Sequence, residues 1–164
     1  METFLLTFSI ICVTLGLLLL FLVPNSDLKV KDLKIPKRKF VLLVLKWCAA
    51  NLGRNSYPFN LQIYYHRHLK WGGRYQHWNQ QIVIYVYDDL LLEDLVETTV
   101  HEYVHHLQFS KKNAEQDYNK NYKEKGYWNN SYEIQARGQA NKFKDSCYQW
   151  VLKEIEKSVK QKGR

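Results

Sequence analysis

The chain has 164 residues, of which 46% are hydrophobic and 15% aromatic, and its formal net charge is +8. This length suits one domain, and the apolar content excludes a wholly disordered chain. Only seven Gly and three Pro are present, which excludes fibrous and low-complexity classes. The cysteines, Cys12, Cys48 and Cys147, are odd in number and far apart, which argues against a disulfide scaffold and against a thiolate zinc site.

The first feature along the chain is residues 4–23, a run of 20 residues without a charge. As a helix it would span about 30 Å, the thickness of the apolar part of a bilayer. A cleaved secretory signal is the alternative. Against it, the only charged side chain before the run is acidic Glu2, and no small-residue cleavage site follows. We therefore expect residues 1–25 to form a retained transmembrane anchor.

The next segment, residues 26–39, is expected to be a basic juxtamembrane linker, because residues 29–39 contain six Lys or Arg and one Asp. Positive charge flanks the cytoplasmic end of a span, which predicts a single-pass membrane protein with a cytoplasmic domain. Residues 153–164 are also basic, with five Lys or Arg and two Glu. An anionic lipid surface is the partner that this distribution favours, a solvated linker without a partner is the alternative, and no nucleic-acid partner is expected.

The remaining residues, 40–164, are expected to form one α+β domain. The elements predicted in chain order are a helix over 40–52, a strand over 62–66, a turn at 71–74, a strand over 81–87, a helix over 90–109, and a helix from 131 to about 157. Residues 110–130 contain no Leu, Ile, Val, Met or Phe, which predicts a mobile, partly helical connection.

The helix over 90–109 contains the motif His101-Glu102-Tyr103-Val104-His105. Two His at positions i and i+4 lie on one face of a helix, so both imidazoles can reach one Zn²⁺. The Glu between them is placed to accept a proton from a water at the metal, which makes Glu102 the candidate catalytic base. Two ordinary helix histidines are the alternative reading of this motif.

The third ligand that a catalytic zinc needs is predicted from the last helix. Its apolar positions recur at Ala136, Ala140, Phe143, Cys147 and Trp150, and the same spacing extends back to Glu133. A carboxylate on a buried helix face is costly unless it is paired or bound to a metal, so we expect Glu133 to join His101 and His105. An exposed Glu133 in the first helical turn is the alternative. Weaker ligand candidates in the polar connection are Glu115, Asp117 and Glu124.

With these residues, the sequence resembles the gluzincins, zinc peptidases that bind the metal through two His and one Glu. The small size resembles the compact, minigluzincin-like members. The resemblance covers about residues 60–150. It implies a zincin-like fold, with a short antiparallel sheet packed on the active-site helix and on a C-terminal helix that carries Glu133. It also implies that a peptide substrate adds as a strand to the edge of the sheet, for which residues 81–87 are the candidate.

The sequence departs from the larger thermolysin-like members at Arg137, where those proteins have an Asp four residues after the ligand Glu. Arg137 is therefore expected either to orient the Glu133 carboxylate or to be solvated. The acidic partner of a ligand His is not identified. The polar candidates for stabilising a transition state are Tyr127, Tyr132 and His106, of which His106 is expected to be structural. A metzincin is disfavoured because Lys111 stands where that group has a His.

The function expected from the sequence is that of a membrane-anchored zinc metallopeptidase that hydrolyses peptide bonds in a protein or peptide substrate. One Zn²⁺ would be bound by His101, His105 and Glu133, and Glu102 would act as general base. Two alternatives stay open. The first is a membrane-tethered, non-catalytic protein-binding module, and the second is a pseudo-peptidase that binds zinc without turnover.

Overall fold

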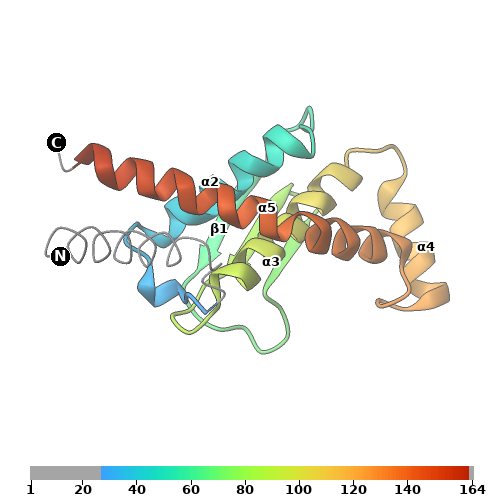
Figure 1. Ribbon diagram of the computed structural model, residues 1–164. Helices are drawn as coiled ribbons and strands as arrows, with labels where there is room; N and C mark the ends of the chain where they lie inside the picture. The colour runs from blue at the N-terminus through green and yellow to red at the C-terminus, as the bar shows by residue number, and fades with distance from the viewer. Residues whose placement is uncertain (1–26, 163–164) are drawn as a thin grey trace, which may run out of the picture.

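The computed structural model describes residues 27–162, which contain four α-helices and a three-stranded sheet (Figure 1). The elements are η1 (Val30–Asp32, a 3₁₀ helix), α2 (Lys37–Asn51), β1 (Asn60–Tyr64), β2 (Gly73–Gln76), β3 (Gln81–Tyr85), α3 (Leu92–Gln108), α4 (Ala114–Lys125) and α5 (Ser131–Lys162). The α+β class is confirmed. Strand β2 lies where only a turn was predicted, and α4 is the helical part of the connection over 110–130.

The sheet is mixed, so the antiparallel sheet expected from the family resemblance is wrong. The strand order is β1-β3-β2, with β1 parallel to β3 and β2 antiparallel to β3. Strand β3 is thus central and paired along both sides, and its side chains from Ile82 to Tyr85 are buried. The expectation that residues 81–87 offer a free edge is therefore also wrong, because β2 and β1 form the edges.

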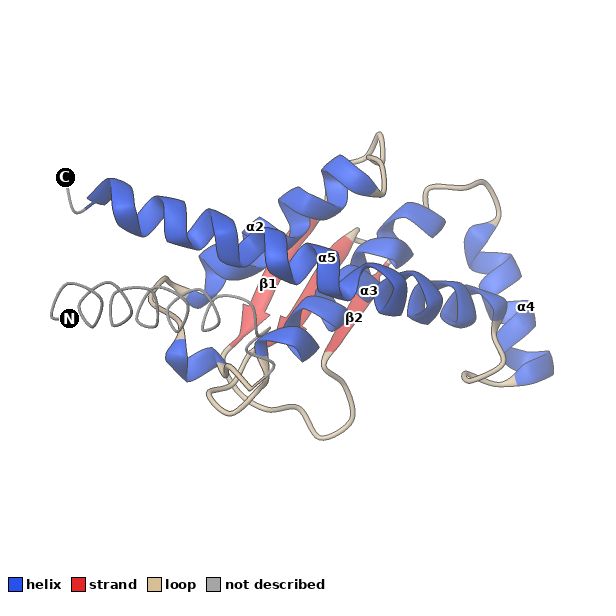
Figure 2. Ribbon diagram, in the orientation of Figure 1, coloured by secondary structure: helices blue, strands red, loops and turns tan. Residues whose placement is uncertain are grey.

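Helices cover one face of this sheet (Figure 2). Helix α3 packs against β2 and β3, and it also packs against α2 and α5. The buried residues of α3 include Val96, Val100 and Val104, which recur every four residues as a core-facing stripe. Helix α5 crosses over α3 and continues past it to contact α2. The site described below lies where α3, α5, α4 and β2 meet.

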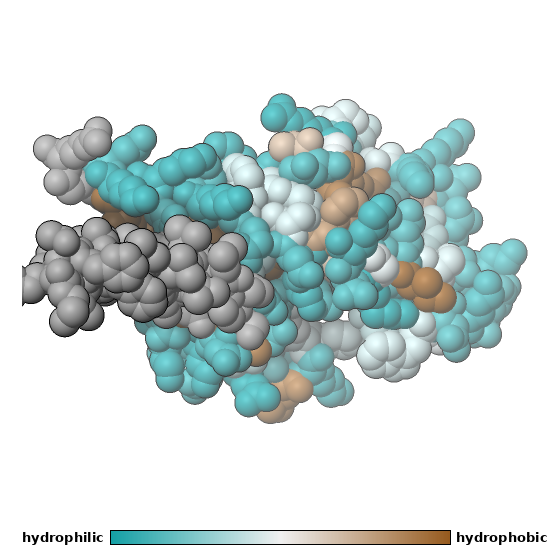
Figure 3. Space-filling view, in the orientation of Figure 1, coloured by the Kyte–Doolittle hydropathy of each residue, from teal (hydrophilic) through white to brown (hydrophobic). Residues whose placement is uncertain are grey.

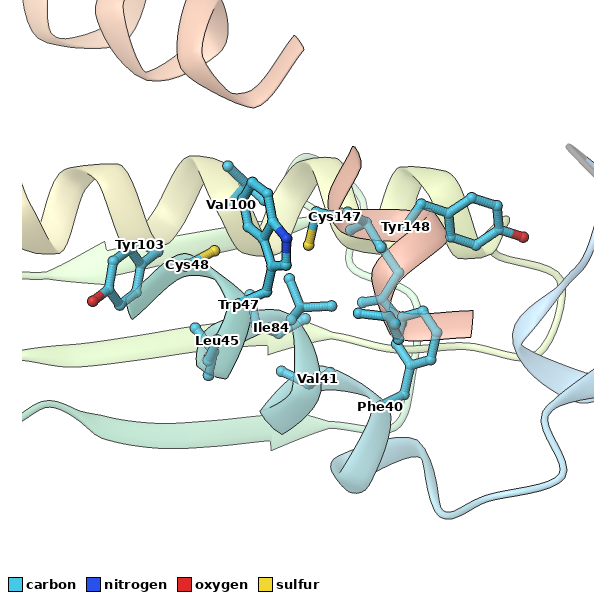
Figure 4. Packing of buried hydrophobic residues seen from close by; sticks show 14 of the residues in the cluster. Phe40, Val41, Leu45, Trp47, Cys48, Ile84, Val100, Tyr103, Cys147 and Tyr148 are labelled. Atoms are coloured by element: carbon cyan, nitrogen blue, oxygen red, sulfur yellow. The ribbon is translucent and has the colours of Figure 1, made fainter. Parts of the chain in front are cut away.

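The hydrophobic core joins the three large helices to the central strand. Figure 4 shows Phe40 and Trp47 from α2, Val100 from α3, Cys147 from α5 and Ile84 from β3 in one cluster. Both described cysteines are buried and free. In contrast, hydrophilic residues cover most of the surface visible in Figure 3, and apolar residues appear there in separate patches.

The described part of the basic segment packs against the domain. Val30 is buried, and its main-chain N–H donates to Leu90. Two lysines of this segment pair with the acidic residues before α3: Lys31 with Asp89 at 3.2 Å and Lys37 with Asp88 at 2.6 Å. Part of the positive charge near the start of the described chain is therefore neutralised within the molecule.

The membrane localisation expected from the sequence is corrected by the structure. Among residues 27–162, no helix combines the length and the apolar character needed to cross a bilayer. Residues 4–23, from which the transmembrane anchor was predicted, lie outside the described residues.

Candidate metal centre

The two histidines of the motif lie one turn apart on α3, on the side that faces the start of α5. Their Nε2 atoms are 3.0 Å apart, and the exposed fractions of the side chains are 15% for His101 and 7% for His105. Each follows a residue of the buried stripe, Val100 or Val104, by one position, which places the imidazoles at the border of the core. The prediction from helical periodicity is confirmed.

Helix α5 brings Glu133 to the same point. Its Oε2 lies 3.3 Å from Nε2 of His101, and its Oε1 lies 3.4 Å from Nε2 of His105. The side chain is only 4% exposed, so the alternative of an exposed first-turn carboxylate is wrong. Ala136 and Ala140, on the same face of α5, are buried, and their small side chains allow α5 to approach α3 closely. The structure therefore brings together the three residues that were predicted as ligands.

The chemistry of this cluster fits a divalent metal ion. A tetrahedral zinc ion with bonds of about 2.0–2.1 Å keeps its ligand atoms about 3.3 Å apart. The candidate ligand atoms of His101, His105 and Glu133, one from each residue, all lie within 4.8 Å of one another. Oε2 of Glu133 is buried and has no hydrogen-bond partner among the described residues. A buried carboxylate oxygen without a donor is costly unless a cation lies beside it. His101, His105 and Glu133 thus form a group that could hold a metal ion.

Gln108 is the outer partner of His105, and sequence reasoning missed it. Its Oε1 lies 2.8 Å from Nδ1 of His105, while its Nε2 donates to the main-chain oxygen of Tyr132 and to Oε1 of Gln135. The carbonyl oxygen of Tyr132 can only accept a hydrogen bond, so the side-chain nitrogen of Gln108 must face it. The side-chain oxygen of Gln108 then faces His105, and Nδ1 of His105 must be the donor. When His105 is neutral, Nε2 therefore carries the lone pair that a metal needs.

Tyr118 is the second contact that sequence reasoning missed. From α4, its hydroxyl donates to Oε1 of Glu133 at 2.8 Å. The ring packs edge-on to His105 and also contacts Phe109 and Tyr132. Residues 110–130 contain no Leu, Ile, Val, Met or Phe. The signal available in this segment was its aromatic residues, the tyrosines and Trp128, because each combines apolar area with a hydrogen-bond donor.

The pKa values of the cluster reflect burial and mutual contacts. Burial alone would raise the pKa of Glu133, but the close approach of His101 and His105, at 3.3 and 3.4 Å from its oxygens, outweighs burial and holds that pKa well below its usual range. Burial acts to lower the pKa of His105, yet the hydrogen bond with Glu133 and the nearby carboxylate charges raise it overall. A divalent cation that binds His105 must displace any proton that its Nε2 carries.

Glu102 is buried on α3 beside the edge strand β2. Its carboxylate accepts a hydrogen bond from the backbone of Tyr75, and burial raises its pKa although His105 and His101 oppose the shift. Gly73 permits the approach of the strand, because a Cβ there would lie 2.9 Å from Cγ of Glu102. The absence of a side chain at Gly73 thus sets the distance between β2 and the candidate base.

An open cleft leads to the cluster. Two hollows of about 420 and 660 Å³ border it, and both are lined by His101, Glu102 and Tyr127. The ring of Tyr127 contacts that of Trp71, which precedes β2. Burial and the charge of Glu133 raise the pKa of Tyr127. Of the polar candidates named from the sequence, Tyr127 is the one whose side chain lines the cleft beside Glu102.

The other candidates have different surroundings. His106 is buried among Phe59, Tyr75 and Tyr103, and it is structural as expected. Tyr132 contacts the site through its main-chain oxygen. The guanidinium of Arg137 donates to the main-chain oxygen of Trp128 at 2.6 Å and lies over the rings of Tyr127 and Trp128, so it holds this segment rather than the Glu133 carboxylate.

The weaker ligand candidates lie apart from the cluster. Among residues 27–162, the one group found that could hold a metal ion consists of His101, His105 and Glu133, without Glu115, Asp117 or Glu124. Glu115 instead pairs with His77 at 2.9 Å across the cleft.

No protein-family model, curated protein or solved structure matches this chain. The features of this molecule that point to a function are therefore the chemistry of the cluster and the cleft around it.

Proposed function

We propose that the protein is a zinc-dependent peptidase with a zincin-like fold and the ligand set of a gluzincin. The observation that carries this proposal is the convergence of His101, His105 and Glu133, whose candidate ligand atoms, one from each residue, all lie within 4.8 Å of one another. The buried, acceptor-only Oε2 of Glu133 and the Nδ1–H tautomer of His105 support a cation at this point. Glu102, next to the cluster in an open cleft, supports a catalytic role rather than a purely structural metal.

Zinc bound to these ligands would polarise the carbonyl of the scissile peptide bond and lower the pKa of a water molecule toward 7. Glu102 would accept a proton from the attacking water and deliver it to the leaving amine. The Glu102 carboxylate is held for this task by the backbone of Tyr75. Tyr127 borders both hollows. Its hydroxyl would donate a hydrogen bond to the oxygen of the attacked carbonyl.

The substrate that fits this cleft is an extended peptide that adds to the outer edge of β2. Tyr85 donates its N–H to the main-chain oxygen of Gly72, so the alternation of an antiparallel pair turns the main-chain groups of Gly73 and Tyr75 away from β3. The N–H of Tyr75 serves Glu102, which leaves the N–H and C=O of Gly73 and the C=O of Tyr75 for a peptide.

The proposal is tested with the full chain and with Glu102→Gln, each loaded with zinc and incubated with an unfolded protein substrate. Cleavage is followed by the appearance of new amino termini, and zinc content by elemental analysis. We expect wild type to bind one zinc and to cleave. We expect Glu102→Gln to keep the zinc and to lose at least about 100-fold in rate, because it cannot accept the proton.

A matched control is Glu93→Gln, which removes a carboxylate from the first turn of the same helix, away from the cleft. It should retain both zinc and activity. Cleavage by Glu102→Gln at the rate of wild type would contradict the assignment of the base. Zinc binding without any cleavage by wild type would contradict the peptidase and favour a non-catalytic zinc protein.

A further inference from the structure

Helix α4 borders the cleft with little apolar packing of its own. Ala114 is its one buried residue among Ala114–Lys125. Its attachments are mostly polar and directed at the site: Glu115 to His77 at 2.9 Å, and Tyr118 to Glu133 at 2.8 Å. Figure 1 shows α4 beside the first turns of α5, where Glu133 lies. The placement of α4 therefore depends on groups that also shape the metal cluster.

The two oxygens of Glu133 have different partners. Oε1 accepts a hydrogen bond from the hydroxyl of Tyr118 and lies 3.4 Å from Nε2 of His105, whereas Oε2 is buried without a hydrogen-bond donor and lies 3.3 Å from Nε2 of His101. A donor to one carboxylate oxygen draws negative charge toward that oxygen and fixes the plane of the group, and the oxygen without a donor is then the one free to bind a cation. The hydrogen bond thus selects which oxygen is free.

We infer that Tyr118 is a positioning residue for the metal: its hydrogen bond to Oε1 holds the Glu133 carboxylate so that Oε2 alone serves as the ligand atom. This inference rests on the metal site of the proposed function, but not on peptide hydrolysis. The ring of Tyr118 is fixed by contacts with Phe109 and Tyr132, so the hydroxyl is held in place before a metal binds. Outer partners of ligands commonly change metal affinity by about 10–100-fold.

A consequence is that metal binding and the docking of α4 stabilise each other. If a docked Tyr118 strengthens binding at Glu133, then a bound metal must favour docked α4 by the same free energy. Helix α4 has little buried apolar area to hold it otherwise, so the effect should be measurable in the exchange of its amide hydrogens.

The test compares full-length wild type, Tyr118→Phe and Tyr122→Phe. Tyr118→Phe keeps the packed ring and removes only the hydroxyl. Tyr122→Phe is the matched control, because Tyr122 stacks on Tyr118 from one turn further along α4 and is 51% exposed. Zinc affinity is measured by competition with a chelating dye, and Co²⁺ is used as a second probe through its visible absorption spectrum. Circular dichroism checks that each variant is folded.

We expect Tyr118→Phe to bind zinc about 10–100-fold more weakly than wild type, and Tyr122→Phe to bind as wild type does. The Co²⁺ spectrum of Tyr118→Phe should become weaker, because a carboxylate free to bind through both oxygens raises the coordination number. In wild type, zinc should slow hydrogen exchange over residues 114–125, and this slowing should be smaller in Tyr118→Phe.

Equal zinc affinity and an unchanged Co²⁺ spectrum in Tyr118→Phe would overturn the inference, as would exchange in α4 that does not respond to zinc in wild type. A wild-type protein that binds neither zinc nor cobalt would overturn the metal site and the inference together. Tight, Tyr118-dependent zinc binding without peptide cleavage would leave the inference standing and contradict only the peptidase.

Discussion

Gln108 links the imidazole of His105 to the main chain of α5. Its side-chain oxygen lies 2.8 Å from Nδ1 of His105, and its side-chain nitrogen lies 2.9 Å from the carbonyl oxygen of Tyr132, the residue before Glu133. One neutral amide therefore orients a candidate ligand on α3 and fixes the start of the helix that supplies another. In many metal sites a carboxylate accepts a hydrogen bond from the ligand His and orients it. Here Gln108 takes that place, and its amide nitrogen also donates to the carbonyl oxygen of Tyr132.

Two substitutions should separate these roles of Gln108. Gln108→Leu removes both hydrogen bonds and leaves the oxygen of Tyr132 without its donor. We expect about 10–100-fold weaker zinc binding and a loss of about 1–3 kcal/mol in the free energy of unfolding. Gln108→Glu keeps an acceptor for His105 and loses the donor, so it should retain zinc binding while losing stability. Isothermal titration with zinc and urea unfolding without zinc measure the two effects.

The neighbouring Gln135 supplies the control for this pair. It accepts from Gln108 at 3.0 Å and does not touch His105, so Gln135→Leu should leave zinc binding unchanged. Wild-type zinc affinity in Gln108→Leu would contradict the role of this amide in orienting the ligand.

The second prediction concerns the close contact between β2 and α3. A methyl group at position 73 would meet Cγ of Glu102 and Cγ2 of Thr98, each at 2.9 Å, and the main-chain oxygen of Val83 at 3.0 Å. The strand must therefore shift away from the helix in Gly73→Ala. We expect a loss of about 1–3 kcal/mol in the free energy of unfolding, since overpacking at a fixed backbone is costly. We also expect a lower rate of cleavage, because the shift moves the peptide-binding edge away from Glu102.

Gly138→Ala is the matched control for Gly73→Ala. A Cβ at Gly138 has no atom within 4 Å, and the residue lies inside α5, where Ala is favoured over Gly by about 1 kcal/mol. This variant should be as stable as wild type or more stable, with unchanged activity. Thermal unfolding and cleavage assays compare the two variants. If Gly73→Ala behaved like Gly138→Ala, the close approach of β2 would not matter for the site.

The cluster was predictable from sequence because it depends on helical periodicity. The spacing of His101 and His105 and the apolar repeat that leads back from Ala140 to Glu133 are local patterns, and a helix converts them directly into shared faces. Both helices formed within a few residues of their predicted bounds. The packing of α5 on α3 then brought the three side chains together.

The sheet was harder to predict because strand partners are not encoded locally. Strand β2 has four residues, Gly73–Gln76, with little apolar content, and it is stabilised by its contacts with β3 and α3. The run Ile82-Val83-Ile84 did contain a usable signal. It lacks the alternation of a half-exposed strand, which is typical of a central strand buried on both faces.

The partners of the candidate ligands could not be read from spacing either. Tyr118 and Gln108 contact Glu133 and His105 only because α4 folds back over the start of α5 and because the end of α3 lies beside Tyr132. Asp88 and Asp89 show the same limit. An Asp just before a helix is typical of an N-cap, but Asp88 and Asp89 pair with lysines from 51 and 58 residues earlier in the chain.

The last prediction concerns stability at alkaline pH. Tyr148 on α5 is 1% exposed, and burial raises its pKa to about 12 from an ordinary value of 10.0. The folded state thus favours the neutral phenol, so this contribution is fully present below about pH 10 and is lost as the pH rises through 12. A shift of two units corresponds to about 1–3 kcal/mol.

In Tyr148→Phe the free energy of unfolding should therefore fall less than in wild type between about pH 9 and pH 12. Urea unfolding at a series of pH values gives this difference, and any effect of the substitution that does not depend on pH cancels from it. Parallel pH profiles for the two proteins would show that Tyr148 does not control the alkaline loss of stability.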